Sequence, residues 1–117
     1  MEGFKQLTTW QKAYNLGLEI YKLAAIFPRR ELFGLSSQIQ RAGVSISANI
    51  AEGYGRNYRK EYLQFLMIAK GSLGEVETYL LFSKDLKYIS LEQYNQIEGL
   101  RQEVGKLLKG LIKSLQA

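Results

Sequence analysis

The sequence predicts an all-α fold, an up-down-up-down antiparallel four-helix bundle that assembles into a homo-oligomer. Apolar residues recur at helical spacing over four long segments, and no segment alternates like a strand. The connectors are short, which places successive helices antiparallel. The segment 35–51 is nearly uncharged, which favours a helix covered on two sides. A length of 117 residues with 46% hydrophobic residues indicates a single domain over 1–117.

The first helix is predicted over residues 8–27. Thr8 or Thr9 is expected to cap its start, because a hydroxyl can accept from a free amide there. Pro28 is expected to end the helix, since the residue before a proline avoids helical angles. An inner stripe with 4-3-4-3 spacing is predicted at Trp10, Tyr14, Gly17, Tyr21 and Ala24.

The second helix is predicted over residues 35–52, and it is the most informative segment. From Leu35 to Ala51 it carries one charge, Arg41. An ordinary surface helix keeps a broad polar face toward water. This helix has apolar residues on two sides: Ile39, Gly43, Ile46 and Ile50 on one, and Val44, Ala48 and Ala51 on the other. We therefore interpret it as the seam of an oligomer. Gly53 and Gly55 are expected to end it in the left-handed conformation.

A polar stripe runs between those two apolar sides, at steps of 3, 4, 4 and 3 residues. Its members are Gln38, Arg41, Ser45, Asn49 and Glu52. They can satisfy one another, or bond to Ser72 and Glu75 of the next helix, as buried polar groups must. They can equally lie at a seam between subunits, together with Gly43, or face a ligand.

The third and fourth helices are predicted over residues 58–87 and 91–115. Asn57 is a candidate cap for the third, and Ser90 with Gln93 forms a capping box before the fourth. The third has its inner stripe at Phe65, Ala69, Ser72, Val76, Tyr79, Ser83 and Leu86. The fourth has a heptad stripe at Tyr94, Ile97, Arg101, Val104, Leu108, Leu111 and Leu115.

The composition excludes several kinds of chemistry. The chain has no histidine and no cysteine, which removes histidine-based nucleophile arrangements, zinc sites and the di-iron motif of other bundles. The glycines around Tyr54 follow a helix rather than a strand, so a phosphate-binding loop is a poor match. We expect a non-enzymatic protein with no catalytic residues, no metal and no cofactor. The start lacks the apolar stretch of a signal peptide, so a cytoplasmic location is expected, with no membrane partner.

The net charge of +5 is distributed unevenly over the predicted bundle. One end combines eight basic with four acidic residues: Lys5, Lys12, Arg56, Arg59, Lys60, Lys106, Lys109 and Lys113, against Glu2, Glu52, Glu61 and Glu103. This basic end predicts phosphate contacts from Arg56, Arg59, Lys60, Lys109 and Lys113, with Tyr54 or Tyr58 able to stack a base. The alternatives are solvated lysines without a partner, and tyrosines 58 and 62 packed on the preceding helix.

Two long motifs resemble the signature of a bacterial protein family. The first is Gln38-Ile39-x-Arg41-Ala42-x-Val44-Ser45-Ile46-x-x-Asn49-Ile50-Ala51-Glu52-Gly53-x-Gly55-Arg56, preceded by Phe27-Pro28 and Glu31-x-x-Gly34-Leu35. The second is Phe65-Leu66-x-Ile68-Ala69-x-Gly71-Ser72-Leu73-x-Glu75-x-Glu77. They resemble the four helix bundle proteins similar to those encoded in intervening sequences of 23S rRNA genes, with the accessory variability determinant of diversity-generating retroelements as a similar protein.

The resemblance implies a homopentamer without known catalytic activity. For the rRNA-encoded members it implies a supposed nucleic-acid role, and for the retroelement relative a basic surface that binds a reverse transcriptase and nucleic acid. Two functions therefore remain open. One is an assembly that binds RNA or DNA through the basic end. The other is a protein-interaction scaffold, or accessory subunit, that docks a partner such as a reverse transcriptase.

Overall fold

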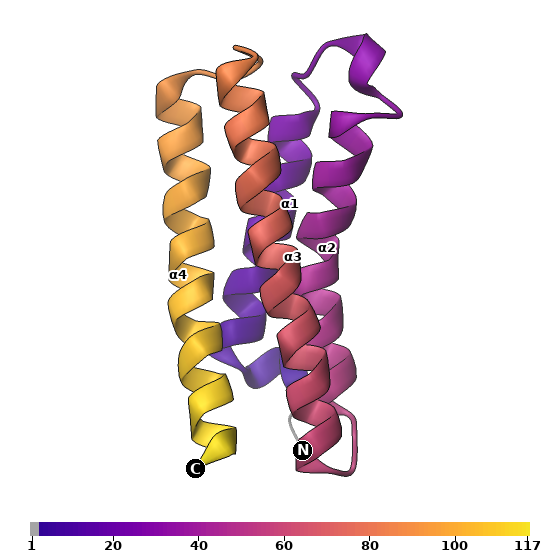
Figure 1. Cartoon of the computed structure of the whole chain (residues 1–117), viewed down its shortest axis with the longest axis vertical. Helices are drawn as coiled ribbons and strands as arrows, with labels where there is room; N and C mark the ends of the chain where they lie inside the picture. The colour runs from indigo at the N-terminus through magenta and orange to yellow at the C-terminus, as the bar shows by residue number, and fades with distance from the viewer. Residues whose placement is uncertain (1–2) are drawn as a thin grey trace.

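The chain forms four α-helices within residues 3–117, the part that the computed structural model describes. They are α1 (Thr8–Ala24), α2 (Leu35–Tyr54), α3 (Arg59–Asp85) and α4 (Leu91–Gln116), with 3-10 turns η1 (Phe4–Gln6) and η2 (Arg29–Glu31). This range contains no strand, so the all-α prediction is confirmed. The α2–α3 turn and the C-terminus lie at one end, and the other two connections lie at the opposite end (Figure 1). Residues 1–2, including Glu2 of the predicted basic end, lie outside the described range.

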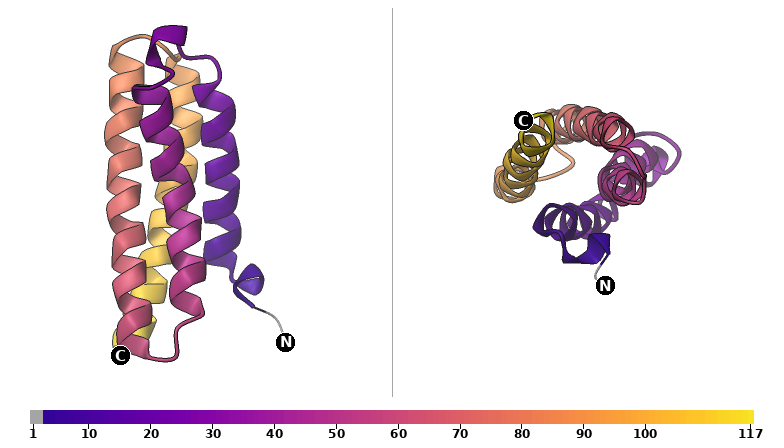
Figure 2. Two further views of the ribbon diagram at one scale, coloured as in Figure 1. Left: turned by 90° about the vertical axis from the view of Figure 1, so that its right-hand side faces the viewer. Right: turned by 90° about the horizontal axis from the view of Figure 1, so that it is seen from below.

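Each helix packs on two neighbours around one shared core. The neighbouring pairs are α1–α2, α2–α3, α3–α4 and α4–α1, which gives the ring seen end-on in Figure 2. The molecule measures 43 × 24 × 23 Å, as expected for helices of this length side by side. The largest fully buried side chains are aliphatic: Leu16, Ile20, Ile39, Ile46, Ile50, Leu66, Leu80, Leu108, Val76 and Val104. Burying each contributes roughly 1.5–3 kcal/mol, so this core is the main source of stability.

Helix α1 differs from its prediction at both ends. Its N-cap is Leu7, with no side-chain hydrogen bond, and Thr9 is buried inside the first turn. The helix stops at Ala24 rather than residue 27, because the backbone changes there to bonds that span three residues. The Phe27 amide donates to the Ala24 carbonyl. This turn places Phe27 in the core, where its ring lies 5.7 Å from that of Tyr88.

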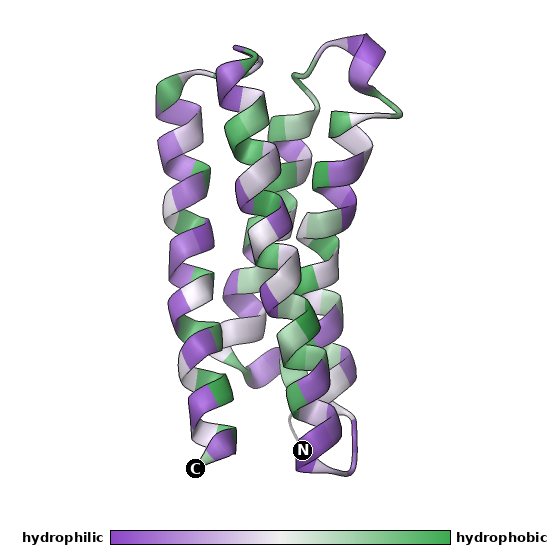
Figure 3. Cartoon of the chain, in the orientation of Figure 1, coloured by the Kyte–Doolittle hydropathy of each residue, from purple (hydrophilic) through white to green (hydrophobic). Residues whose placement is uncertain are grey.

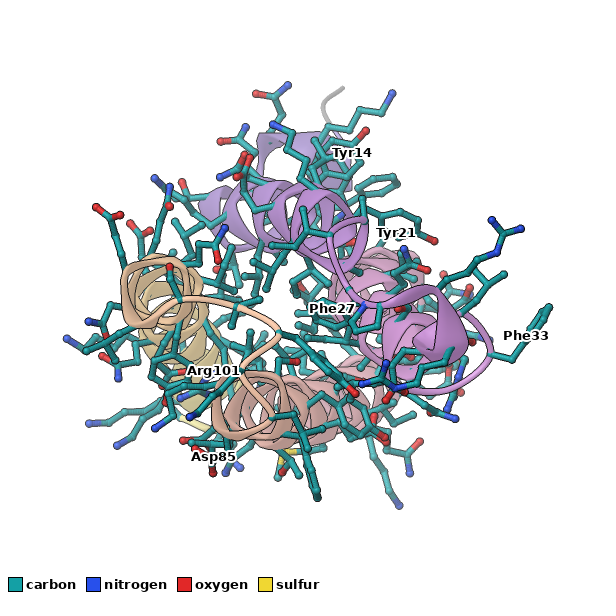
Figure 4. All side chains as sticks on the ribbon, turned by 90° about the horizontal axis from the view of Figure 1, so that it is seen from above. Tyr14, Tyr21, Phe27, Phe33, Asp85 and Arg101 are labelled. Atoms are coloured by element: carbon teal, nitrogen blue, oxygen red, sulfur yellow. The ribbon has the colours of Figure 1, made fainter. Side chains whose placement is uncertain are left out.

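The predicted inner stripe of α1 was wrong at Tyr14 and Tyr21, where the preceding residue is buried instead. Ala13, Leu16, Ile20 and Leu23 are the buried residues, whereas the side chains of Tyr14 and Tyr21 are 49% and 48% exposed. Figure 4 shows both tyrosines outside the ring of helices. Aliphatic side chains fill the narrow centre without a polar atom, while a tyrosine keeps its hydroxyl in water by lying outside.

The glycines after α2 do not act as left-handed caps. The helix continues through Gly53 to Tyr54, and Gly55 has a φ of −79°, which is right-handed. Within residues 3–117 the one non-glycine residue with positive φ is Lys87, at 64°, and no glycine has one. There the amide of Tyr88 bonds to Ser83 and that of Lys87 to Lys84, which ends α3 in a Schellman motif with lysine in the usual place of glycine.

The remaining helix ends and faces are close to the predictions. Helix α3 begins at Arg59 with Tyr58 as N-cap, so Asn57 does not cap it, and it ends at Asp85. Leu86 is exposed beyond that end instead of lying on the inner stripe. The capping box of Ser90 and Gln93 is present. Four large hydrophobic residues of α3 remain exposed: Met67, Ile68, Leu81 and Phe82. Figure 3 colours the chain by hydropathy and shows hydrophobic segments alternating with hydrophilic ones along α3.

Candidate functional site

The α2–α3 turn is fixed by a close approach of the two helices. A Cβ added to Gly53 would lie 2.8 Å from the Phe65 Cβ and 2.9 Å from the Tyr62 Cδ1, so no larger residue fits without movement. Glycine is needed here for proximity and not for its dihedral angles. The last turn of α2 and the first turn of α3 therefore hold the basic residues between them on a rigid base.

The three cations of this turn differ in what surrounds them. Arg56 donates to Glu52 at 2.7 Å, and its guanidinium carbon lies 4.8 Å from the centre of the Phe65 ring. Arg59 and Lys60 are exposed, and neither forms an ion pair within the described chain. Arg56 is thus partly neutralised, while no carboxylate of the described chain neutralises Arg59 or Lys60.

The tyrosines of the turn also differ. Tyr58 is 68% exposed, whereas the ring of Tyr54 packs edge-on against Tyr62 with centroids 6.1 Å apart. The Tyr62 hydroxyl is buried and has no hydrogen-bond partner among residues 3–117. Burial raises the pKa of Tyr62, with a smaller contribution from Tyr54. Tyr62 therefore packs on α2 as the alternative reading held, and Tyr58 does not, which leaves Tyr58 as the ring with a free face.

Lys109 and Lys113 lie on the last turns of α4, at the same end of the bundle as the α2–α3 turn (Figure 1). Both are exposed, and neither forms an ion pair in the described range. With Lys70 of α3 they line a groove between α3 and α4. Lys12, also predicted at this end, is 3.4 Å from Glu103 and contributes less free charge.

The polar stripe of α2 is joined by hydrogen bonds, and some of them reach α3. Arg41 donates to Gln38 at 2.6 Å, and Asn49 donates to the carbonyl and hydroxyl of Ser45. Ser72 of α3 donates to the Ser45 hydroxyl at 2.8 Å. Glu75 takes no part in these bonds. At its exposed end the stripe continues through the Glu52–Arg56 pair already described.

Gly43 does not lie with this stripe. A Cβ there would lie 2.9 Å from the Ile20 Cδ1, and a Cβ on Gly17 would lie 3.4 Å from the Gly43 carbonyl oxygen. The two glycines therefore form the close crossing of α1 and α2 inside one subunit. Gly43 therefore packs against α1 of its own subunit, and its place at a seam between copies stays a prediction.

A second polar cluster, at the opposite end, was missed by the sequence reasoning. Glu31 accepts from the Leu35 amide at 3.0 Å and from the Tyr88 hydroxyl at 2.7 Å. The amide, the hydroxyl and then Arg30 lower the pKa of Glu31, and the bond to Glu31 raises the pKa of Tyr88. A Cβ on Gly34 would lie 2.8 Å from the Glu31 Oε1. The spacing Glu31-x-x-Gly34-Leu35 could have predicted this cluster, because a carboxylate four residues before Leu35 can accept from the first amide of α2.

Arg101, predicted on the inner stripe of α4, forms an ion-pair network across α3 and α4. It donates to Glu98 through two bonds of 2.6 and 2.7 Å, and its Nη2 lies 3.3 Å from Glu77 of α3. These bonds lower the pKa of Glu98 and raise that of Arg101. Figure 4 shows Arg101 where α3 and α4 adjoin.

Residues 3–117 contain no group of three acidic side chains placed to hold a metal ion.

An exposed apolar face lies along α1 and α2. Tyr14, Leu18 and Tyr21 of α1 and Val44 of α2 are each about half exposed. They line a shallow hollow of about 250 Å³ together with Gly17 and Ser47. We refer to Tyr14, Leu18, Tyr21 and Val44 as the α1–α2 face.

None of the helices in the described range is long and apolar enough to cross a membrane.

The comparisons with known proteins agree with this architecture. The family model of the 23S rRNA-intervening sequence protein matches residues 5–110. A crystal structure of a protein of unknown function from the S23 ribosomal protein family of Bacteroides thetaiotaomicron is similar, with 32% identity and a TM-score of 0.85. The match covers 91% of this chain and 99% of that one. No curated protein matches the chain. Since the family model covers nearly the whole sequence, the chain belongs to the family of 23S rRNA-intervening sequence proteins.

Proposed function

We propose that this chain, an up-down-up-down antiparallel bundle, assembles into a cytoplasmic homopentamer that binds RNA or DNA through its basic end without catalysing a reaction. The observation that carries the binding proposal is the set of exposed cations without an anionic partner in the described chain: Arg59, Lys60, Lys109 and Lys113. Cations of this kind bind phosphates by releasing counterions. The family name, which refers to 23S rRNA, supports RNA as the first ligand to test.

The α1–α2 face supports the assembly proposal. Four half-exposed hydrophobic side chains border a helix that has one charge between Leu35 and Ala51. A second copy covering this face would remove apolar surface from water, which stabilises association. A closed ring of subunits with parallel axes would bring their basic ends together and sum their positive potentials. Assembly would therefore strengthen the attraction for a polyanion.

Binding is expected to depend on the phosphate backbone more than on the bases. Arg59 and Lys60 reach phosphates from the start of α3, and Lys109 and Lys113 do so from the end of α4. Tyr58 is the ring available to stack a base, since Tyr54 already packs on Tyr62. Such contacts are weakly specific for sequence and are lost steeply as the salt concentration rises.

Fluorescence anisotropy with a labelled single-stranded RNA, over a series of salt concentrations, tests the binding proposal. Changing Arg59 and Lys60 together to Gln should weaken binding and lower the slope of log affinity against log salt by roughly one per lost contact. The matched control removes two exposed cations at the opposite end, Arg29→Gln with Lys87→Gly, and should change little. If the control weakens binding as much as the test pair, or if wild type does not bind at low salt, the proposal is wrong.

Light scattering after size exclusion tests the assembly proposal. Val44→Glu places a charge on the α1–α2 face and should reduce the mass of the assembly toward the 13.4 kDa of one subunit. Asn95→Glu, on the exposed side of α4, is the control and should leave the mass unchanged. A wild-type mass of one subunit at micromolar concentration would contradict the proposal.

A further inference from the structure

A groove of about 620 Å³ lies between α3 and α4 toward the C-terminal end of α4. We call it the α3–α4 groove. Its floor is apolar, formed by Leu73, Leu108 and Ile112, and the half-exposed Met67 lies at its side. On α4 the lining extends from Arg101 to Gln116, which is about 22 Å at 1.5 Å per residue. A groove of this length matches a helix of about four turns.

Two glycines line the α3–α4 groove and, having no side chain, leave space open in it. Gly74 of α3 and Gly105 of α4 both line it, and a Cβ at either position would have no described atom within 4 Å. Packing within the chain therefore does not require glycine at these positions. A glycine inside a helix costs about 1 kcal/mol relative to alanine, so the open space comes at the expense of stability. That space is available to a ligand.

The charged residues that line the groove are all basic. Lys70 lies on the α3 side, and Lys109 and Lys113 lie one turn apart on the α4 side. All three are exposed and lack an ion pair within residues 3–117, whereas Arg101 at one end is already bound by Glu98 and Glu77. An occupant that carries anionic groups on both sides of an apolar ridge would therefore be complementary to this groove.

The lining distinguishes between kinds of anion. Of the described residues that line the groove, none is aromatic, so unpaired bases would find no ring on which to stack. A fatty acid has one charged head group and could engage the cations on one side alone. An amphipathic helix can place apolar side chains at i, i+3 or i+4 and i+7 on the floor, and acidic side chains along both edges.

We propose that the α3–α4 groove binds an acidic amphipathic helix of a partner protein. The helix places aliphatic anchors on Leu73, Leu108 and Ile112, with Met67 adapting to their shape. Its carboxylates pair with Lys70 on one edge and with Lys109 and Lys113 on the other. This inference does not rest on nucleic-acid binding, and it gives the scaffold alternative a defined surface.

The test uses a displayed library of helical peptides about 18 residues long, selected on the intact protein. The enriched peptides should be amphipathic and acidic, and their affinities are then measured by fluorescence polarisation. Gly105→Leu fills the groove, and its Cβ meets no neighbouring atom within 4 Å, so it should weaken binding about tenfold or more while the fold is kept. Gly99→Leu is the matched control, since it is also on α4, has open space around its Cβ and lies outside the groove. It should leave the affinity unchanged.

Charge gives a second, independent readout. Changing Lys109 and Lys113 to Gln should weaken the enriched peptides and reduce the salt dependence of their binding. RNA binding should be unaffected by Gly105→Leu, which separates this proposal from the nucleic-acid proposal. The docking proposal is overturned if no acidic amphipathic peptide is enriched, or if the two leucine variants bind the peptides equally. It is also overturned if sodium palmitate is the ligand that depends on Gly105, or if Gly105→Leu lowers the mass of the assembly.

Discussion

The two sides of α3 use glycine in opposite ways. Toward α2, Gly53 is pressed against Phe65 and Tyr62, and hydroxyls from both helices meet at Ser45 and Ser72. Toward α4, Gly74 and Gly105 face open space and a groove follows between the helices. The same residue permits contact on one side and leaves a gap on the other. A helical glycine is therefore interpretable only from the atoms that face it.

The largest expected effect tests the close side. Gly53→Ala should destabilise the protein by about 2–3 kcal/mol, because the new Cβ meets the Phe65 Cβ and the Tyr62 carbonyl, neither of which can rotate away. Gly43→Ala should cost about 1 kcal/mol, since it meets mainly the mobile end of Ile20. Urea denaturation measures both. Equal costs for the two variants would show that the α2–α3 contact is not the tighter one.

The next effect concerns the hydroxyls between α2 and α3. Ser45→Ala should cost about 1–2 kcal/mol, because the buried Ser72 hydroxyl loses its acceptor. Ser72→Ala should cost about 1 kcal/mol, as Ser45 keeps its bond from Asn49. The double variant should cost less than the sum of the single ones. Additive costs in this double-mutant cycle would mean that the Ser45–Ser72 bond contributes nothing.

The open side should respond in the opposite direction. Gly74→Ala and Gly105→Ala should each raise the free energy of unfolding by about 0.5–1 kcal/mol, since alanine favours the helix and meets no atom of the described chain. Thermal and urea denaturation provide the measurement. If either alanine destabilises the protein, α3 and α4 approach more closely than the structure places them, and the comparison fails.

The smallest effect concerns the start of α2. The pKa of Glu31 is lowered from its ordinary value of 4.5, first by the Leu35 amide and then by the Tyr88 hydroxyl. The carboxylate therefore stabilises the fold above that value, and its contribution is lost as the pH falls through the lowered pKa. Glu31→Gln should make the free energy of unfolding fall less steeply below pH 4.5. Tyr88→Phe should do so to a smaller extent, and an unchanged slope in both would contradict the role of Glu31.

The sequence allowed the helices to be predicted because their signals are periodic and local. The capping box at Ser90 needed no knowledge of neighbours, and it is present. The heptad of α4 is confirmed at Ile97, Val104 and Leu108, whereas Ile112 is buried where Leu111 and Leu115 were predicted. Tyr14 and Tyr21 follow the spacing of an inner stripe, yet α1 turns Leu16 and Ile20 inward. Spacing defines a face, but the space at the centre of the bundle decides which face is buried.

The site was predictable only in part, for a related reason. Arg56 and Arg59 look equivalent in the sequence, but Glu52 and Phe65 surround the first and leave the second free. The Glu31–Tyr88 bond joins residues 57 positions apart, which no local pattern announces. Likewise, the α3–α4 groove depends on where α3 and α4 separate. Neither the Glu31–Tyr88 bond nor this groove can be read from residues that are near one another in the sequence.

The bond between Glu31 and Tyr88 also fastens two connections of the bundle to each other. The chain before α2 and the chain before α4 lie at the same end (Figure 1), and the carboxylate, the phenol and the Leu35 amide make them one unit. The final turns of α4 at the other end have no such fastening among the described residues, and they border an open groove. Local opening should therefore begin there, with amides of residues 108–116 exchanging hydrogen earliest within α4. Opening of these turns of α4 would widen the α3–α4 groove while the opposite end of the bundle stays closed.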